Sequence, residues 1–267
     1  MKKVLTIAGS DCSGGAGIQA DLKTMSALGV YGMSVITAIT AQNTVGVFKV
    51  QEIDKEMIEA QLKSIFEDID VDAVKIGMVS NVEIIRAIRV KLLEYQAKNI
   101  VVDPVMVSKS GYFLLQLEAM EELKELIAIA DVVTPNIPEA EALTGLSIQS
   151  EEDMKVAAQR IYELGPKYVL VKGGHRVNDA NDLLYDGKQF IRIRGKRIET
   201  KNTHGTGCTL SSAITSLLAR GNGIQEAVEG AKAYITQAIS DALDIGHGVG
   251  PVGHFVELYR KVGLVIE

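Results

Sequence analysis

Short apolar runs alternate with amphipathic stretches along most of the chain. Between the runs, apolar residues recur every three or four positions, as Ile18, Leu22 and Met25 do, which is typical of a helix with one buried face. The longest helical stretches are residues 206–220 and 224–243. The apolar runs predict buried strands at residues 4–8, 34–40, 73–76, 99–102, 131–134 and 168–172. This order predicts an α/β fold with three layers, α/β/α, around a mostly parallel central sheet.

Residues 182–199 have a different pattern. Apolar and polar positions alternate there with a period of two, and Asp186-Gly187 and Gly195-Lys196 are typical turn pairs. This pattern predicts a short antiparallel hairpin or meander at one edge of the sheet. The chain contains no repeat, low-complexity tract or linker, so we expect residues 1–267 to form a single domain.

Composition excludes some classes of partner. The net charge is −6, and acidic and basic residues are mixed along all 267 positions. The sequence has no basic stripe and no apolar run near the roughly 20 residues that cross a membrane. We therefore expect neither a nucleic-acid partner nor a membrane span. The two cysteines, Cys12 and Cys208, lie far apart without zinc-site spacing, which favours a reduced, cytoplasmic protein.

A glycine-rich loop follows the first strand. Residues 15–20 match the dinucleotide-binding pattern G-x-G-x-x-G/A. That site also requires an acidic residue at the end of the second strand, where this chain has Ala41-Gln42-Asn43. The missing acid argues against a dehydrogenase. The chain also lacks the G-x-x-x-x-G-K-[ST] pattern of a P-loop.

A second glycine turn, Gly205-Thr206-Gly207, precedes the helix predicted at residues 206–220. The start of a helix has unpaired N–H groups and a partial positive charge, so such a turn is suited to binding phosphate. The alternative is a tight turn that only caps a buried helix.

Polar residues occur where several predicted strands end. Asp103 follows one strand, Asn136 and Glu139 follow the next, and Lys172 ends another. Ligands of parallel sheets bind beyond the carboxyl ends of the strands, so we expect these side chains to converge. Two acids that can hold Mg²⁺, a lysine and a phosphate-binding turn are the parts used in phosphoryl transfer from a nucleotide. The set favours an enzyme over a passive nucleotide-binding or vitamin-binding regulator.

Seven segments in order resemble one family over essentially the whole chain. The chain resembles the hydroxymethylpyrimidine/phosphomethylpyrimidine kinases of thiamine synthesis, which have the ribokinase-like fold. The segments are Gly9-Ser-Asp-Cys-Ser-Gly-Gly-Ala-Gly-Ile-Gln-Ala-Asp21, Thr40-Ala-Gln-Asn-Thr44, Lys75-Ile-Gly-Met78, Asp103-Pro-Val-Met106, Thr134-Pro-Asn-Ile-Pro-Glu139-Ala, Val171-Lys-Gly-Gly-His175 and His204-Gly-Thr-Gly-Cys208.

The resemblance implies an enzyme that uses ATP and Mg²⁺. It implies that Asp103 and Glu139 act around Mg²⁺, directly or through water. By the same resemblance, ATP lies along Asn136, Lys172 and Thr203. The anion hole under the transferred phosphoryl group is implied at Gly205, Thr206, Gly207 and Cys208.

The family also implies a pyrimidine pocket and a flap. The pocket residues would be Gly9, Asp21, Gln42, Met78 and Val105, and the flap would include Lys109, Ser110 and Gly111. A carboxamide such as Gln42 offers an aminopyrimidine both a donor and an acceptor. From its residue type alone, Asp21 has the alternative of a solvated helix face.

Cys208 takes the place where many ribokinase-like enzymes have an aspartate base. A helix N-terminus lowers the pKa of a thiol, so we expect a thiolate to be accessible, acting as a base or only positioning the acceptor hydroxyl. The flap has no cysteine, whereas some pyridoxal-phosphorylating relatives have one there, and this difference favours pyrimidine. Pyridoxal or pyridoxine kinase is the alternative function, and relatives are commonly homodimers.

Overall fold

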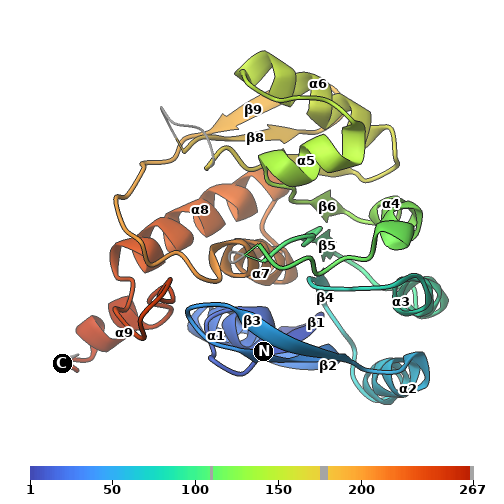
Figure 1. Cartoon of the computed structure of the whole chain (residues 1–267), viewed down its shortest axis with the longest axis horizontal. Helices are drawn as coiled ribbons and strands as arrows, with labels where there is room; N and C mark the ends of the chain where they lie inside the picture. Colours follow the sequence, from blue (N-terminus) through green and yellow to red (C-terminus); the bar gives the residue numbers. More distant parts are fainter. Residues whose placement is uncertain (109–110, 175–179, 265–267) are drawn as a thin grey trace.

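Strands and helices alternate in the computed structural model, which describes residues 1–108, 111–174 and 180–264 (Figure 1). The strands are β1 (Lys3–Asp11), β2 (Tyr31–Gln42), β3 (Val47–Glu52), β4 (Ala73–Ile76), β5 (Ile100–Val102), β6 (Val132–Val133), β7 (Tyr168–Val171), β8 (Asp182–Tyr185) and β9 (Phe190–Ile193). The helices are α1 (Gly17–Ala27), α2 (Lys55–Phe66), α3 (Val82–Glu94), α4 (Met120–Ile127), α5 (Ile137–Thr144), α6 (Glu151–Tyr162), α7 (Thr206–Ala219), α8 (Ile224–Ser240) and α9 (Val256–Lys261), with a 3-10 turn at Leu117–Ala119.

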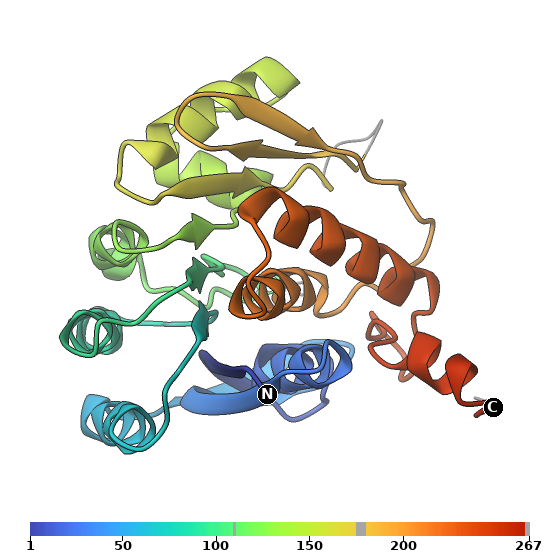
Figure 2. The same cartoon turned by 180° about the vertical axis from the view of Figure 1, so that it is seen from behind.

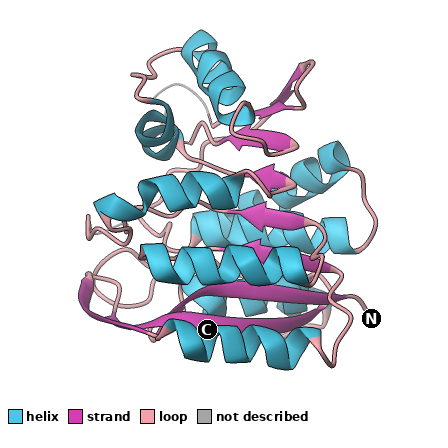
Figure 3. Cartoon of the chain, turned by 90° about the vertical axis from the view of Figure 1, so that its right-hand side faces the viewer, coloured by secondary structure: helices cyan, strands magenta, loops and turns pink. Residues whose placement is uncertain are grey.

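All the strands named above join one sheet. Its order is β3-β2-β1-β4-β5-β6-β7-β8-β9, and the pairs from β2 to β7 are parallel. Helices lie on both sides of the sheet (Figure 1), and the view turned by 90° in Figure 3 shows the strands side by side. The predicted three-layer fold with a mostly parallel sheet is therefore confirmed, and β8 and β9 form the predicted antiparallel hairpin at one edge.

The opposite edge carries a second antiparallel strand, β3, which the sequence pattern did not predict. It pairs with β2. Its side chains are exposed or half-buried, and Phe48 is 66% exposed. The prediction failed here because an edge strand of this kind buries too little to leave an apolar run in the sequence.

Alternating side chains of the central strands pack into different hydrophobic cores on the two faces of the sheet. Ile100 and Val102 pack into the larger one, with residues from α2 to α6, whereas Val101 between them faces the core beneath α7 and α8. Figure 1 shows α2, α3 and α4 on one side of the sheet and α1, α7 and α8 on the other, and Figure 2 shows the same layers from behind. Within the described ranges, no helix combines the length and the apolar character needed to cross a membrane.

Candidate active site

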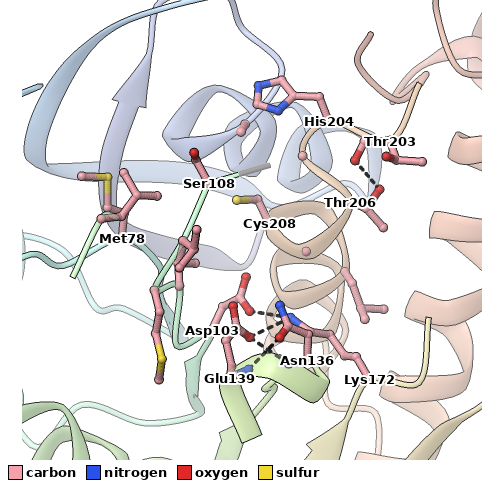
Figure 4. Close-up of a pocket in the computed structure, with 18 of the residues that line it drawn as sticks. Met78, Asp103, Ser108, Asn136, Glu139, Lys172, Thr203, His204, Thr206 and Cys208 are labelled. Carbon is pink, nitrogen blue, oxygen red and sulfur yellow. Dashed lines mark hydrogen bonds and ion pairs between the residues drawn. The ribbon is translucent and has the colours of Figure 1, made fainter. Parts of the chain in front are cut away.

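A cavity of about 1010 Å³ opens where the parallel strands end. Most residues that the sequence assigned to the site line this cavity. They are Gly9, Gln42, Met78, Asp103, Val105, Asn136, Glu139, Lys172, Thr203, Gly205, Thr206, Gly207 and Cys208. Figure 4 shows Asp103, Asn136, Glu139 and Lys172 as one group beside the start of α7. The convergence expected from the strand ends is thus present in the fold.

The turn before α7 depends on Gly205. This residue has a φ of +81°, and a Cβ atom there would overlap the carbonyl oxygen of Gly15. Thr206 Oγ1 donates a hydrogen bond to the Thr203 carbonyl at 2.8 Å, which closes the turn. No side chain of the described residues caps α7. The Thr206 N–H donates to the Thr203 carbonyl at 3.3 Å, which leaves the N–H groups of Gly207 and Cys208 for the cavity. This arrangement can bind an anion.

Asp103, Glu139 and Lys172 form a buried charged group. Lys172 Nζ lies 2.8 Å from Asp103 Oδ1 and 3.9 Å from Glu139 Oε2. Burial alone would raise the pKa of Asp103, but the cations of Lys172 and Lys75 and the hydrogen bonds from Lys172 and Thr134 lower it below the usual value. Asp103 is therefore anionic at neutral pH.

The pKa of Glu139 shifts in the opposite direction. Burial raises the pKa of Glu139 to about 7, and the negative charge of Asp103 adds to this effect, while Lys172 opposes it. The side chain also accepts a hydrogen bond from the backbone N–H of Asn136, whose own side chain accepts one from the Glu139 N–H. This reciprocal pair caps α5, so both residues position the helix as well as facing the cavity.

Two acids at this point are suited to a hard cation. In the described residues, no group of three His, Cys, Asp or Glu side chains surrounds a possible metal position. Mg²⁺ usually keeps several waters and is held by one or two carboxylates together with substrate phosphates. Asp103 and Glu139 provide that number of carboxylates, and Lys172 would share the phosphate charge.

The surroundings of Cys208 disfavour a thiolate. Burial raises the pKa of the Cys208 thiol to about 11; Lys75 opposes this shift, while Asp21 and Asp103 add to it. The helix N-terminus and the nearby lysine are outweighed by loss of water and by the two carboxylates. The raised pKa favours a neutral thiol, which can position a hydroxyl group, over an ionised base.

The predicted contact of Asp21 with substrate is also wrong. Asp21 does not line the cavity, and its side chain is fully buried. Its carboxylate accepts hydrogen bonds from Thr6 Oγ1 and Ser212 Oγ, both at 2.6 Å, and from Lys75 Nζ at 2.8 Å. With these partners, Asp21 ties elements together beneath the site, and the alternative of a solvated helix face is excluded as well.

The wall opposite α7 is partly apolar. Met78 and Val105 line it, and Gly9 allows the Met78 sulfur to approach, since a Cβ at Gly9 would lie 2.9 Å from that atom. Gln42 adds a carboxamide at the end of β2. These residues form a pocket for a flat ring with one polar edge.

The predicted flap begins as a small antiparallel turn. Val107 pairs with Phe113, and the Ser108 N–H donates to the Tyr112 carbonyl at 2.8 Å. Gly111 adopts a φ of +85° in this turn and does not line the cavity. Lys109 and Ser110 lie outside the described residues, as does His175 of the resembling segments.

Sequence reasoning assigned no role to Asp11 or His204, although both line the cavity. His204 Nε2 lies 2.8 Å from Asp11 Oδ2. Asp11 ends the first strand and His204 begins the glycine turn, so their shared position at the carboxyl edge of the sheet was the available signal.

Comparisons with known proteins agree with this site. The family model described as phosphomethylpyrimidine kinase matches residues 11–253. A hydroxymethylpyrimidine/phosphomethylpyrimidine kinase from Rhizobium meliloti is 55% identical over 256 residues, covering 94% of this chain and 96% of that protein. A thiamine biosynthesis bifunctional protein from Geobacter sulfurreducens is 53% identical over 255 residues, and the chain spans 52% of its length.

Solved structures of small-molecule kinases have the same fold as this chain. A phosphomethylpyrimidine kinase from Clostridium difficile has a TM-score of 0.81 and 56% identity, covering 90% of this chain and all of that one. A Bacillus subtilis pyridoxal kinase in complex with ADP has a TM-score of 0.90 and 43% identity, covering 97% and 99% of the two chains. The predicted ribokinase-like fold, phosphotransferase activity and place in thiamine biosynthesis are thereby confirmed, and the chain belongs to the phosphomethylpyrimidine kinase family.

Proposed function

We propose that the chain uses ATP and Mg²⁺ to phosphorylate 4-amino-5-hydroxymethyl-2-methylpyrimidine and then its monophosphate. One observation carries this proposal: the Asp103, Glu139 and Lys172 group and the uncapped start of α7 face the same cavity. The volume of about 1010 Å³ is at the upper end for ligand pockets and has room for a nucleotide and a second small molecule.

The residues divide into three roles. Asp103 and Glu139 would hold Mg²⁺, which supplies positive charge to the phosphates during transfer. Lys172, Asn136 and Thr203 would bind ATP. The N–H groups of Gly205, Gly207 and Cys208, in the turn that Thr206 closes, would stabilise charge on the transferred group. Gln42, Met78, Val105 and Gly9 would hold the pyrimidine ring. Cys208, as a neutral thiol, would orient the acceptor hydroxyl, because loose phosphoryl-transfer transition states require little base catalysis.

Pyridoxal phosphorylation is the second candidate function. The likeness to the Bacillus subtilis pyridoxal kinase favours it, since that structure superposes on 97% of this chain. A pyridoxal kinase from Staphylococcus aureus in complex with pyridoxal also has a TM-score of 0.87. Both substrates are six-membered rings with a hydroxymethyl group, so the same anion hole serves either one.

The deciding experiment measures ADP release with Mg·ATP and three acceptors at equal concentration: hydroxymethylpyrimidine, its monophosphate and pyridoxal. We expect turnover on both pyrimidines to exceed turnover on pyridoxal. Turnover mainly on pyridoxal would replace the substrate assignment. ADP release that does not depend on any acceptor would leave the chain as a binder with residual ATPase activity. The Asp103→Asn variant is the control for contaminating kinases.

We further propose that residues 1–267 form one kinase domain and that the protein works as a cytoplasmic homodimer. Continuity of the sheet from β3 to β9 supports the first point. Both cysteines are free, which accords with a reducing compartment. Exposed apolar side chains, including Ile39 and Phe48, lie on the paired strands β2 and β3 and offer a surface for a second copy. Sedimentation equilibrium tests the assembly.

A further inference from the structure

Four polar side chains meet at the carboxyl ends of β1 and β2, beside the turn before α7. His204 Nε2 lies 2.8 Å from Asp11 Oδ2 and 3.2 Å from the Nε2 atom of Gln42. At the other end of the carboxamide, Gln42 Oε1 lies 3.2 Å from Thr40 Oγ1. Thr40 Oγ1 also lies 2.9 Å from the carbonyl oxygen of Ser10. The carboxamide of Gln42 is thus held at both ends, and Gln42 lines the cavity.

Asp11 is a carboxylate, so it only accepts hydrogen bonds. Its Oδ2 accepts from the backbone N–H groups of Gly15 and Ala16, and its Oδ1 accepts from the N–H and hydroxyl of Ser13. Burial would raise the pKa of Asp11, but the hydrogen bonds from His204 and Ser13 lower it to about 2. The nitrogen of His204 that faces Asp11 must therefore carry the proton.

This proton decides which end of the Gln42 carboxamide faces His204. A protonated ring nitrogen and an NH₂ group are both donors and cannot bond to each other. The two ends of a carboxamide have almost the same shape, so the surrounding hydrogen bonds determine which end is oxygen. The end of the carboxamide towards His204 must therefore be the oxygen. This oxygen and the Asp11 carboxylate both accept from the Nε2–H group of His204.

Thr40 leads independently to the same orientation. Its hydroxyl proton goes to the carbonyl oxygen of Ser10, which can only accept. The hydroxyl oxygen of Thr40 then accepts a hydrogen bond from the other end of Gln42, so that end must be the NH₂ group. Two separate partners therefore require one orientation of the carboxamide.

We propose that Asp11 and His204 are positioning residues that fix the Gln42 carboxamide with its oxygen towards His204 and its NH₂ group towards Thr40. One lone pair and one N–H remain on the carboxamide for a ligand. The cavity therefore offers an acceptor and a donor in a fixed order, and a ligand must present a donor and an acceptor side by side.

This consequence for substrate choice rests on the proposed function. An aminopyrimidine has an exocyclic NH₂ group next to a ring nitrogen, which pairs with both ends of the carboxamide. With its ring nitrogen towards Gln42, pyridoxal places a methyl group beside that nitrogen, so one end of the carboxamide would stay unpaired. A binding site with an unpaired buried polar group discriminates strongly against that ligand. The fixed orientation thus acts as a selectivity device.

The loop at Gly15 holds the imidazole ring in place. A Cβ atom at Gly15 would overlap His204 Cδ2, so the backbone of this loop packs directly on the ring. The same loop donates its N–H groups to Asp11. The ring and the carboxylate are therefore fixed by one segment, as a positioning role requires.

The first test does not use activity. A long-range ¹H–¹⁵N correlation spectrum of protein labelled with ¹⁵N-histidine reports which ring nitrogen carries the proton. The His204 signals are assigned by their loss in His204→Gln. We expect a protonated Nε2 at pH 7.5 without any ligand. A bare Nε2 with a protonated Nδ1 would overturn the proposal, whatever the enzyme phosphorylates.

The second test is a double-mutant cycle on the KM for hydroxymethylpyrimidine. We expect His204→Leu and Gln42→Ala each to raise this KM about 10-fold or more, with smaller changes in kcat and in the KM for ATP. The double variant should be no worse than Gln42→Ala alone, since His204 acts through Gln42. Independent losses that multiply, or a loss confined to kcat, would contradict the positioning role.

Two further variants separate positioning from folding. His204→Gln retains an N–H donor at the end of the side chain, so we expect its KM for hydroxymethylpyrimidine to be much closer to the wild-type value than the raised KM of His204→Leu. His254→Gln is the matched control, because His254 is equally buried and hydrogen-bonded to Thr209 but does not line the cavity. It should leave the ratio of pyrimidine to pyridoxal turnover unchanged. If neither pyrimidine is a substrate, the proposed function fails while the spectrum still decides the orientation.

Discussion

Lys75 Nζ lies 2.8 Å from Asp21 Oδ2, and neither side chain has any exposed surface. The pair joins β4 to α1, and hydrogen bonds to Thr6 and Ser212 extend it to β1 and α7. These four elements meet beneath the turn that begins at Gly205. The charge of Lys75 also opposes the rise in the Cys208 pKa. The ion pair is therefore part of the support on which the anion-binding turn is built.

Breaking this pair should be costly. In Lys75→Met, Asp21 would remain buried without its cation, and we expect the free energy of unfolding to fall by about 3–5 kcal/mol. Urea denaturation followed by circular dichroism measures the change. Lys91→Met is the control, since Lys91 pairs with Glu94 on the surface and should cost less than about 1 kcal/mol.

The double variant Lys75→Met, Asp21→Asn completes this test. It removes both charges and should recover much of the lost stability, because replacing a whole buried ion pair costs less than removing one partner. A double variant as unstable as the sum of the two single variants would show that packing, rather than charge, explains the loss.

The sequence contained more information about Asp21 than its residue type. Ile18, Leu22 and Met25 predict the buried face of α1, and Asp21 falls on the same face by helical spacing. Lys75 likewise interrupts an apolar strand. Two opposite charges at buried positions predict a pair, although sequence alone does not show that these two elements are neighbours.

Other features depend on the three-dimensional surroundings. The order of strands and helices was predictable because each buried element repeats with its own period. The neutral thiol of Cys208 was not, because it depends on how much water the fold removes from that side chain. The orientation of Gln42 was also hidden, since it follows from His204, which Asp11 holds, and Thr40 meeting it at opposite ends. The ends of the predicted strands identified most residues of the site, whereas the protonation and orientation of these residues depend on packing in the fold.

Gly205 should not tolerate a side chain. Its φ is +81°, and the added Cβ in Gly205→Ala would overlap the Gly15 carbonyl oxygen. We expect the turn to shift and kcat to fall more than 10-fold, on the order of 1.4 kcal/mol of lost transition-state stabilisation. Gly221→Ala is the control: its φ is +94°, but a Cβ would meet no atom within 4 Å. That variant should lose about 1 kcal/mol of stability and keep its kcat.

The two cysteines should differ in reactivity towards iodoacetamide. Cys12 is exposed, whereas burial holds the pKa of Cys208 at about 11. At pH 8, we expect Cys12 to be alkylated first, with Cys208 at least 10-fold slower, since only the thiolate reacts. Mass spectrometry of peptides follows both sites, and Cys12→Ser isolates the slow one. Rapid alkylation of Cys208 at pH 8 would show that its thiolate is populated and would contradict the raised pKa.

Glu139 should make the Mg²⁺ requirement depend on pH. Its pKa is about 7, so the side chain is neutral below pH 7 and anionic above it. If Glu139 helps to hold Mg²⁺, binding must release its proton at low pH. We expect the Mg²⁺ concentration for half-maximal activity to fall about 10-fold between pH 6 and pH 8, about half of the protein being ionised at Glu139 by pH 7, and to level off above pH 8. Steady-state assays at fixed ATP measure this value.

Glu139→Gln provides the control, because glutamine can also form the capping pair with Asn136 and so keeps the start of α5 intact. The step near pH 7 should disappear in this variant.

The free energy of unfolding gives a second readout: unfolded Glu139 ionises near pH 4.5, whereas the folded side chain keeps its proton up to about pH 7. Stability from this group is therefore full below pH 4.5 and is lost as pH rises to 7, by about 3 kcal/mol at most. A wild-type protein whose stability relative to Glu139→Gln does not change between pH 5 and pH 8 would contradict the raised pKa.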